Sequence, residues 1–133
     1  MAFESGGFRN FQQPMEEIIE YMWLKPGFTN LNVDVFADDG QAYLRHNHNL
    51  QLLVRNGYGK SIDEFIPFLV SDNPVVLDKT MELNISEDDI SCVKEFIVGN
   101  LDNLRELADR KISQSAFVGN IKISSYPHLA EKR

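Results

Sequence analysis

Residues 31–55, LNVDVFADDGQAYLRHNHNLQLLVR, carry the alternating pattern on which the expected fold rests. Apolar side chains occupy every second position over residues 31–37, which indicates a half-buried strand. The tripeptide at 38–40 predicts a hairpin turn, because Asp-Gly accommodates the positive φ of tight turns. We therefore expect residues 41–46 to pair back on the first strand and residues 50–55 to form a third.

The chain on either side of this segment predicts a helix and more strands. Residues 14–24 combine a proline in the first turn with an apolar stripe, which favours a short N-terminal helix. Residues 62–70, 75–77 and 81–85 are each typical of a short strand. Pro67 places the first of these at a sheet edge or a bulge, because proline has no amide hydrogen for a ladder.

The hydrophobic period then changes from two to about 3.6, which predicts a long C-terminal helix over residues 87–111. Ser86 is a suitable N-cap and acidic residues follow it, as expected at a helix start. The Gly99-Asn100 dipeptide could kink or divide this helix. The expected fold is α+β, with one antiparallel sheet of about five short strands packed against the long helix, plus the short N-terminal helix.

The chain of 133 residues is the size of one domain, which we place at residues 14–112. Residues 1–13 are expected to form a flexible arm. Residues 113–133 are expected to be an extension with a short strand at 116–123 and a loose tail. The arm's aromatic residues are candidates for docking on a partner protein or a second subunit; they are Phe3, Phe8 and Phe11.

The composition narrows the classes of partner. Thirteen basic and 20 acidic residues give a net charge of −7, which disfavours direct binding to nucleic acid or an anionic membrane. Cys92 is the single cysteine, so an internal disulfide is excluded. There is no apolar run long enough to span a bilayer and no leader-like N-terminal core, so we expect a cytoplasmic protein.

The histidines are the candidate metal ligands. On a strand, His46 and His48 would lie on one face, as the first two ligands of a site for a divalent metal such as zinc or iron. Asp38 and Asp39 are the nearest candidates to assist. Asp34 and His128 are further candidates for the third ligand. The alternative is that the two histidines are polar residues at a strand end that bind nearby backbone groups.

The catalytic motifs that would identify an enzyme are absent from the sequence. It contains no phosphate loop, no G-x-S-x-G and no dinucleotide-binding fingerprint. The contiguous His46-Asn47-His48 does not have the separated residues of an HNH nuclease. Nor do the acids at 38–39 have the spacing of a calcium loop. The sequence therefore favours a protein that is not an enzyme and needs no cofactor, with a divalent metal as the open alternative.

Two pieces of the chain, residues 33–54 and 86–107, are similar to a known family. The first carries the histidine pair, and the second has the pattern F-I-x-x-N-x-x-x-L at Phe96, Ile97, Asn100 and Leu104. In this order of features the chain resembles the DUF4160-type small bacterial proteins. The resemblance implies a small cytoplasmic bacterial protein, associated with toxin–antitoxin-like or mobile-element gene pairs, and it names no catalytic residue.

Three functions follow as hypotheses. The first is a non-catalytic interaction or regulatory module that binds another protein or forms a homo-oligomer, through a sheet edge or through the aromatic arm. The second is a small metal-dependent enzyme that uses His46 and His48. The third is an acidic inhibitor that occupies the basic nucleic-acid groove of a partner.

Overall fold

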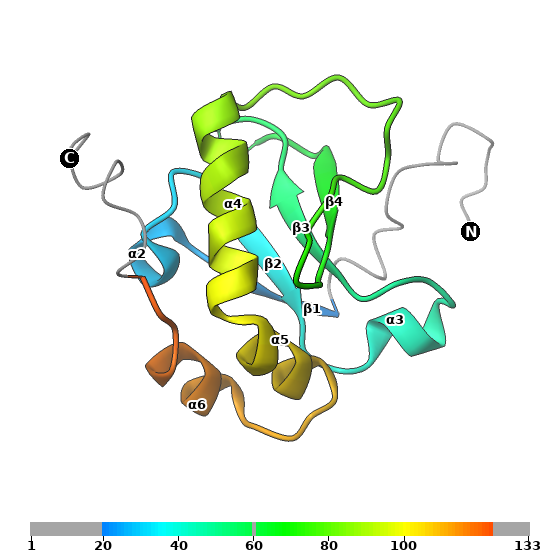
Figure 1. Ribbon diagram of the computed structural model, residues 1–133, viewed down its shortest axis with the longest axis vertical. Helices are drawn as coiled ribbons and strands as arrows, with labels where there is room; N and C mark the ends of the chain where they lie inside the picture. Colours follow the sequence, from blue (N-terminus) through cyan, green and yellow to red (C-terminus); the bar gives the residue numbers. More distant parts are fainter. Residues whose placement is uncertain (1–19, 60, 124–133) are drawn as a thin grey trace.

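The computed structural model describes residues 20–59 and 61–123, and it is an α+β fold built on one antiparallel sheet (Figure 1). The sheet has four strands in the order β1-β2-β3-β4, so each strand pairs with its neighbours in sequence. Their bounds are Tyr21–Leu24, Val35–Asp38, Gln51–Arg55 and Phe65–Leu69. The helices are α2 (Pro26–Thr29), α3 (Ala42–Arg45), α4 (Glu87–Gly99), α5 (Leu101–Ala108) and α6 (Gln114–Gly119).

One face of the sheet forms the main core with α4 and α5, which cover it in Figure 1. Alternate strand residues point into this core, as the two-residue period of a strand requires. These are Leu24, Val35, Ala37, Leu52, Val54, Ile66 and Phe68 from the strands. The helices contribute Cys92, Val93, Phe96, Ile97, Leu104 and Leu107, and α6 adds Phe117.

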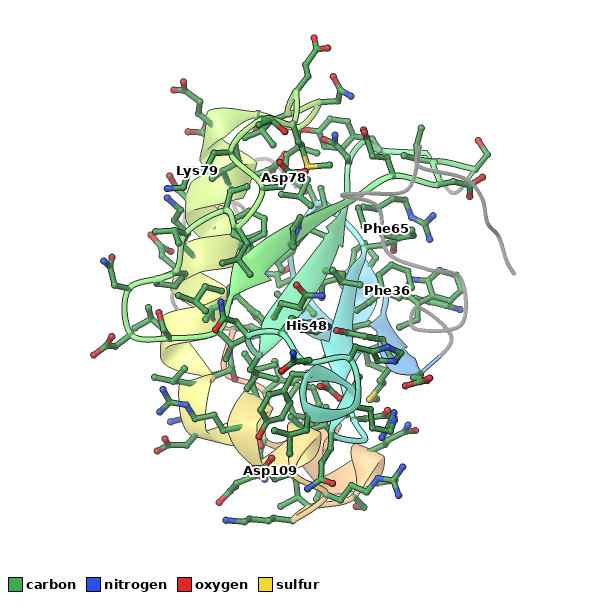
Figure 2. The ribbon with its side chains drawn as sticks, turned by 90° about the vertical axis from the view of Figure 1, so that its right-hand side faces the viewer. Phe36, His48, Phe65, Asp78, Lys79 and Asp109 are labelled. Atoms are coloured by element: carbon green, nitrogen blue, oxygen red, sulfur yellow. The ribbon has the colours of Figure 1, made fainter. Side chains whose placement is uncertain are left out.

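The opposite face of the sheet carries a second apolar cluster, which we call the aromatic face. Its buried members are Tyr21, Phe36 and Leu53 from the strands and Ala42 of α3; Phe65 of β4 packs against them, and Trp23 stacks on Phe36. Figure 2 shows Phe36 and Phe65 on the side of the sheet away from α4. Among the described helices only α3 contributes a residue to this cluster.

The sheet has four strands within the described residues, not the expected five, and the expected long helix is two helices. The division falls at Gly99-Asn100, where α4 ends and α5 begins. The Asn100 side chain donates to the Phe96 and Lys122 carbonyls, and its oxygen accepts from the Lys122 amide. The α4 start agrees with the sequence, because the Ser86 hydroxyl accepts from the Asp89 amide.

The helix expected over residues 14–24 is wrong for its last four residues, which form β1 and pair with β2. Residues 14–19 lie outside the described part of the chain. The strand expected at 41–46 is also wrong, because Ala42–Arg45 is helix α3. A four-residue apolar segment such as Tyr21–Leu24 fits the period of a helix as well as that of a strand, and pairing with β2 makes it a strand.

The strand expected over 50–55 is confirmed by β3, and β4 lies at a sheet edge, as Pro67 predicted. Residues 75–77 contribute only an isolated bridge from Val76 to Phe68. Residues 81–85 form no strand; instead the Asn56 side chain binds the Glu82 carbonyl and the Asn84 amide.

The strand expected at 116–123 is wrong, because residues 114–119 form helix α6, whose start is capped by Ser113. Within residues 20–59 and 61–123, none of the helices has the length and apolar character needed to cross a bilayer.

Candidate functional site

The Asp38 carboxylate organises the loop that carries the histidines. One oxygen accepts from the Gly40 and Ala42 amides at 3.0 and 2.9 Å, and the other accepts from the Tyr43 amide at 2.9 Å. Asp38 is buried, with 3% of its surface exposed. Its carboxylate therefore holds the first turn of α3 in place, which is the work of a helix cap.

The two histidines follow α3 and do not lie on a strand. His46 is the C-cap of α3, and His48 comes two residues later in a loop. Their rings are nearly parallel, at 12°, with centroids 6.3 Å apart. The His46 Nε2 lies 3.3 Å from a Glu20 oxygen, and the His48 Nδ1 lies 2.7 Å from the Asn49 carbonyl oxygen. The proposed pair is thus brought together, with Glu20 as its acidic neighbour.

The other proposed ligands among the described residues bind protein groups and not the histidines. Asp39 accepts from the Gln114 side chain, and Asp34 accepts from the Arg55 Nε at 3.1 Å. In the described part of the chain, no group of three or more His, Cys, Asp or Glu side chains is arranged to hold a metal ion. His128 lies outside the described residues, as do Phe3, Phe8 and Phe11.

Charged contacts fix α3 to its surroundings. Arg45 donates to the Glu20 carboxylate and to the Gly40 carbonyl. The hydrogen bond from Arg45 lowers the pKa of Glu20, and the same bond raises the pKa of Arg45. The Tyr43 hydroxyl donates to Asp109 at 2.8 Å, which raises the pKa of Tyr43. These contacts tie α3 to the start of β1 and to the end of α5.

The aromatic face surrounds a guanidinium group. Trp23 stacks on Phe36 with centroids 6.1 Å apart, and Phe65 meets Phe36 edge-on at 5.2 Å. The Arg55 guanidinium carbon lies 5.9, 5.4 and 5.7 Å from the ring centres of Trp23, Phe36 and Phe65. Such distances are within the range of cation–π attraction.

The exposed rim of this face is aromatic and basic. Trp23 is 40% exposed, and the Lys25 ammonium lies 5.1 Å from its ring centre. Arg55, in contrast, is only 7% exposed, and it is held by Asp34 and by the Ile62 carbonyl at 2.6 Å. Trp23 and Lys25 are therefore the groups of this surface that a ligand would meet first.

The hydrogen-bond pattern of the sheet shows which way the Trp23 backbone points. In an antiparallel ladder, a residue directs its N–H and C=O to one side, and the side alternates along the strand. The Pro67 carbonyl accepts from Leu77, on the side of β4 away from β3. Leu53 lies opposite Pro67, so the backbone N–H and C=O of Leu53 point toward Phe36 of β2. By the same alternation Trp23, opposite Phe36, directs its N–H and C=O away from β2.

The two edge strands of the sheet, β1 and β4, differ in whether another described segment binds their outer side. At the β4 edge, Leu69 donates to the Val75 carbonyl and Leu77 donates to Pro67, so residues 75–77 shield the strand. At the β1 edge, no strand from the described part of the chain is paired. The backbone of Trp23 thus faces an edge that can accept another strand.

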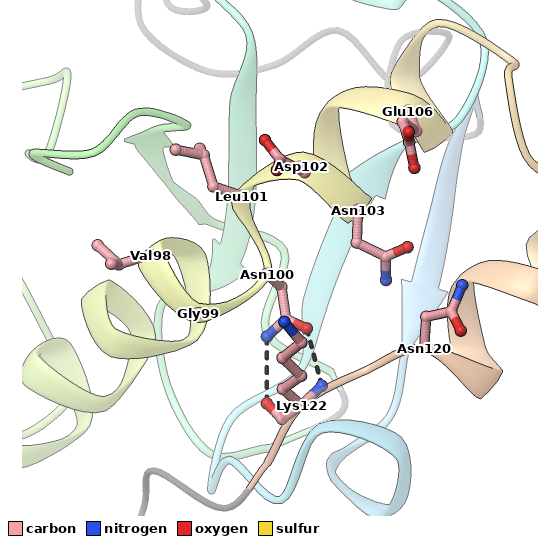
Figure 3. A pocket seen from close by; sticks show the side chains of 9 residues that line it. All are labelled: Val98, Gly99, Asn100, Leu101, Asp102, Asn103, Glu106, Asn120 and Lys122. Carbon is pink, nitrogen blue, oxygen red and sulfur yellow. Dashed lines mark hydrogen bonds between the residues drawn. The ribbon is translucent and has the colours of Figure 1, made fainter.

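A polar cleft of about 420 Å³ lies where α4 meets α5 (Figure 3). Its lining comes from Val98, Gly99, Asn100, Leu101, Asp102, Asn103, Glu106, Asn120 and Lys122. Figure 3 shows the Asn100 side chain directed at the Lys122 backbone, with which it makes two hydrogen bonds. Asn103 likewise donates to the Phe117 carbonyl. The amides of this cleft therefore hold α6 and the chain that follows it against α4 and α5.

A search of protein-family models, of curated proteins and of solved structures returned no significant match to this chain. The resemblance to the DUF4160-type proteins accordingly stays a prediction.

The sequence did not reveal the aromatic face. Trp23 lies in the segment 14–24, whose apolar stripe predicts a helix, and a helix would place its side chain in that stripe. The contact of Trp23, Phe36, Phe65 and Arg55 depends on the register of all four strands. The one available signal was the alternation of Tyr21 and Trp23 with Met22 and Leu24, which fits a strand as well.

Proposed function

We propose that this protein is a non-catalytic interaction module that binds an extended segment of a partner protein along the outer edge of β1. The observation that carries the proposal is the Trp23 backbone, which faces an edge without a strand from the described residues, next to an exposed indole. Adding a strand to a sheet edge is a common mode of peptide recognition, in which the backbone supplies affinity and neighbouring side chains supply specificity.

The chemistry of the edge defines the partner segment. Trp23 offers an aromatic surface and Lys25 offers an exposed positive charge on the same side of the strand. A segment with an apolar or aromatic residue opposite Trp23 and an acidic residue near Lys25 complements both. Pro26 begins α2 directly afterwards, so the pairing ends there.

Site-specific cross-linking in cells tests the proposal. A photoreactive amino acid at Lys25 is expected to capture a partner, whereas the same group at the exposed Glu95 of α4 is not. The captured partner is then measured against two variants, Trp23→Pro and Trp23→Val. Both remove the indole, but only proline removes the amide hydrogen that faces the open edge.

We expect Trp23→Pro to bind the partner about 5-fold more weakly than Trp23→Val, because one hydrogen bond contributes roughly 1 kcal/mol. Equal binding by the two variants would refute pairing along the edge. A partner captured equally from Lys25 and Glu95 would refute the location. The metal-dependent enzyme and the acidic inhibitor remain predictions.

A further inference from the structure

A candidate occupant of the aromatic face is the N-terminal segment of the chain itself. Nineteen residues precede Glu20, and at about 3.3–3.6 Å per extended residue they can reach roughly 60 Å. Four strands at about 4.8 Å spacing are only about 15 Å wide. The segment is therefore long enough to cross the whole face.

This segment joins the fold beside the aromatic face. Glu20 is held by Arg45 and His46 of the α3 region, which lies beside that face. Tyr21, the next residue, already contributes its side chain to the aromatic cluster. The chain thus enters β1 at the border of the surface, next to Trp23.

The composition of the segment complements the surface. Phe3, Phe8 and Phe11 supply three of the chain's nine phenylalanines within its first 11 residues. Residues 1–13 contain one acidic and one basic residue, Glu4 and Arg9, and two further acids, Glu16 and Glu17, follow before Glu20, whereas the exposed charge beside Trp23 is Lys25. The aromatic residues of the segment match the indole surface, and Glu16 and Glu17, which connect the segment to β1, have the charge opposite to that of the lysine.

We propose that residues 1–13 dock through Phe3, Phe8 and Phe11 on the aromatic face around Trp23 and act as an intramolecular competitor of the partner segment. This regulatory role rests on the proposed function. The docking itself does not, since it can be measured in the absence of any partner. Because the segment is tethered, its effective concentration is in the millimolar range, and weak contacts are enough to keep it in place.

Trp23 is the only tryptophan of the chain, so intrinsic fluorescence reports directly on this surface. The test compares the full-length protein with a full-length variant that carries Phe3→Ser, Phe8→Ser and Phe11→Ser. We expect emission from the variant to move to longer wavelength and acrylamide to quench it more strongly, because its indole is more exposed to water. A control carries Asn10→Ser, Gln12→Ser and Gln13→Ser and is expected to match the unmodified protein.

A synthetic peptide of residues 1–13, added to the triple-phenylalanine variant, is expected to reverse both changes, while a scrambled peptide is not. Identical emission and quenching in the variant and the unmodified protein would overturn the proposal. So would a spectral change that the peptide does not reverse, since that would reflect altered folding. If docking holds the segment in place about nine-tenths of the time, the variant binds the cross-linked partner about 10-fold more tightly.

Discussion

Replacement of Asp38 by alanine is the sharpest test of how the loop before α3 is built. The substitution removes the acceptor of three backbone amides, those of Gly40, Ala42 and Tyr43, at a position where 3% of the residue is exposed. Loss of a helix cap costs up to about 2 kcal/mol, and hydrogen bonds to a charged group contribute about 1.5–3 kcal/mol each without being additive. We expect Asp38→Ala to lower the free energy of unfolding by about 3 kcal/mol.

The neighbouring aspartate provides a matched control. Asp39 has the same side chain, but its bond is to the exposed Gln114 side chain, so Asp39→Ala is expected to cost less than about 0.5 kcal/mol. Urea unfolding followed by circular dichroism measures both. With a slope of about 1.5 kcal/mol per molar urea, the midpoint falls by about 2 M for Asp38→Ala. Equal midpoints for the two variants would refute the capping role.

Three further predictions follow from the polar contacts. Tyr43→Phe removes the hydrogen bond from the Tyr43 hydroxyl to Asp109 and lowers the free energy of unfolding by about 1 kcal/mol. Because this bond raises the pKa of Tyr43, the difference in stability between the variant and the wild type is present below pH of about 10 and disappears at higher pH. Urea unfolding across that pH range measures the difference. Arg45→Gln raises the pKa of Glu20 toward its ordinary value, which an NMR titration of that carboxylate detects. In the wild type, the Arg45–Glu20 pair stabilises the fold above pH of about 4.5 and stabilises it less at lower pH, where Glu20 becomes protonated. Asn100→Ala leaves backbone groups without their partner and lowers the free energy of unfolding by about 2 kcal/mol, measured by urea denaturation, and an unchanged midpoint would contradict the hydrogen-bond assignment.

The C-terminal helices were predictable because their signals are local. Ser86 caps α4 through the amide three residues later, and the Gly99-Asn100 dipeptide divides the helix as its composition allowed. Both effects involve residues within one or two turns of each other. Sequence patterns describe such short-range interactions well.

The first half of the chain was harder to predict because its outcome depends on distant contacts. Ala42–Arg45 is a helix whose start is held by Asp38 and whose end is held by Arg45 binding Glu20. Tyr21–Leu24 is a strand because β2 is available beside it. Neither the cap nor the pairing partner can be recognised from the residue pattern of the segment itself. The histidine pair therefore lies at the end of a helix and not, as predicted, on one face of a strand.

The open edge and the stability of the sheet depend on different groups of β1. Met22 and Leu24 direct their side chains toward the main core, and the ladder alternation turns their backbone toward β2. Trp23 directs its side chain to the aromatic face and its backbone to the outer edge. Because these roles alternate along the strand, Trp23 can be changed while the β1–β2 ladder is kept. The partner strand that we propose would therefore not compete for the hydrogen bonds that hold β1 in the fold.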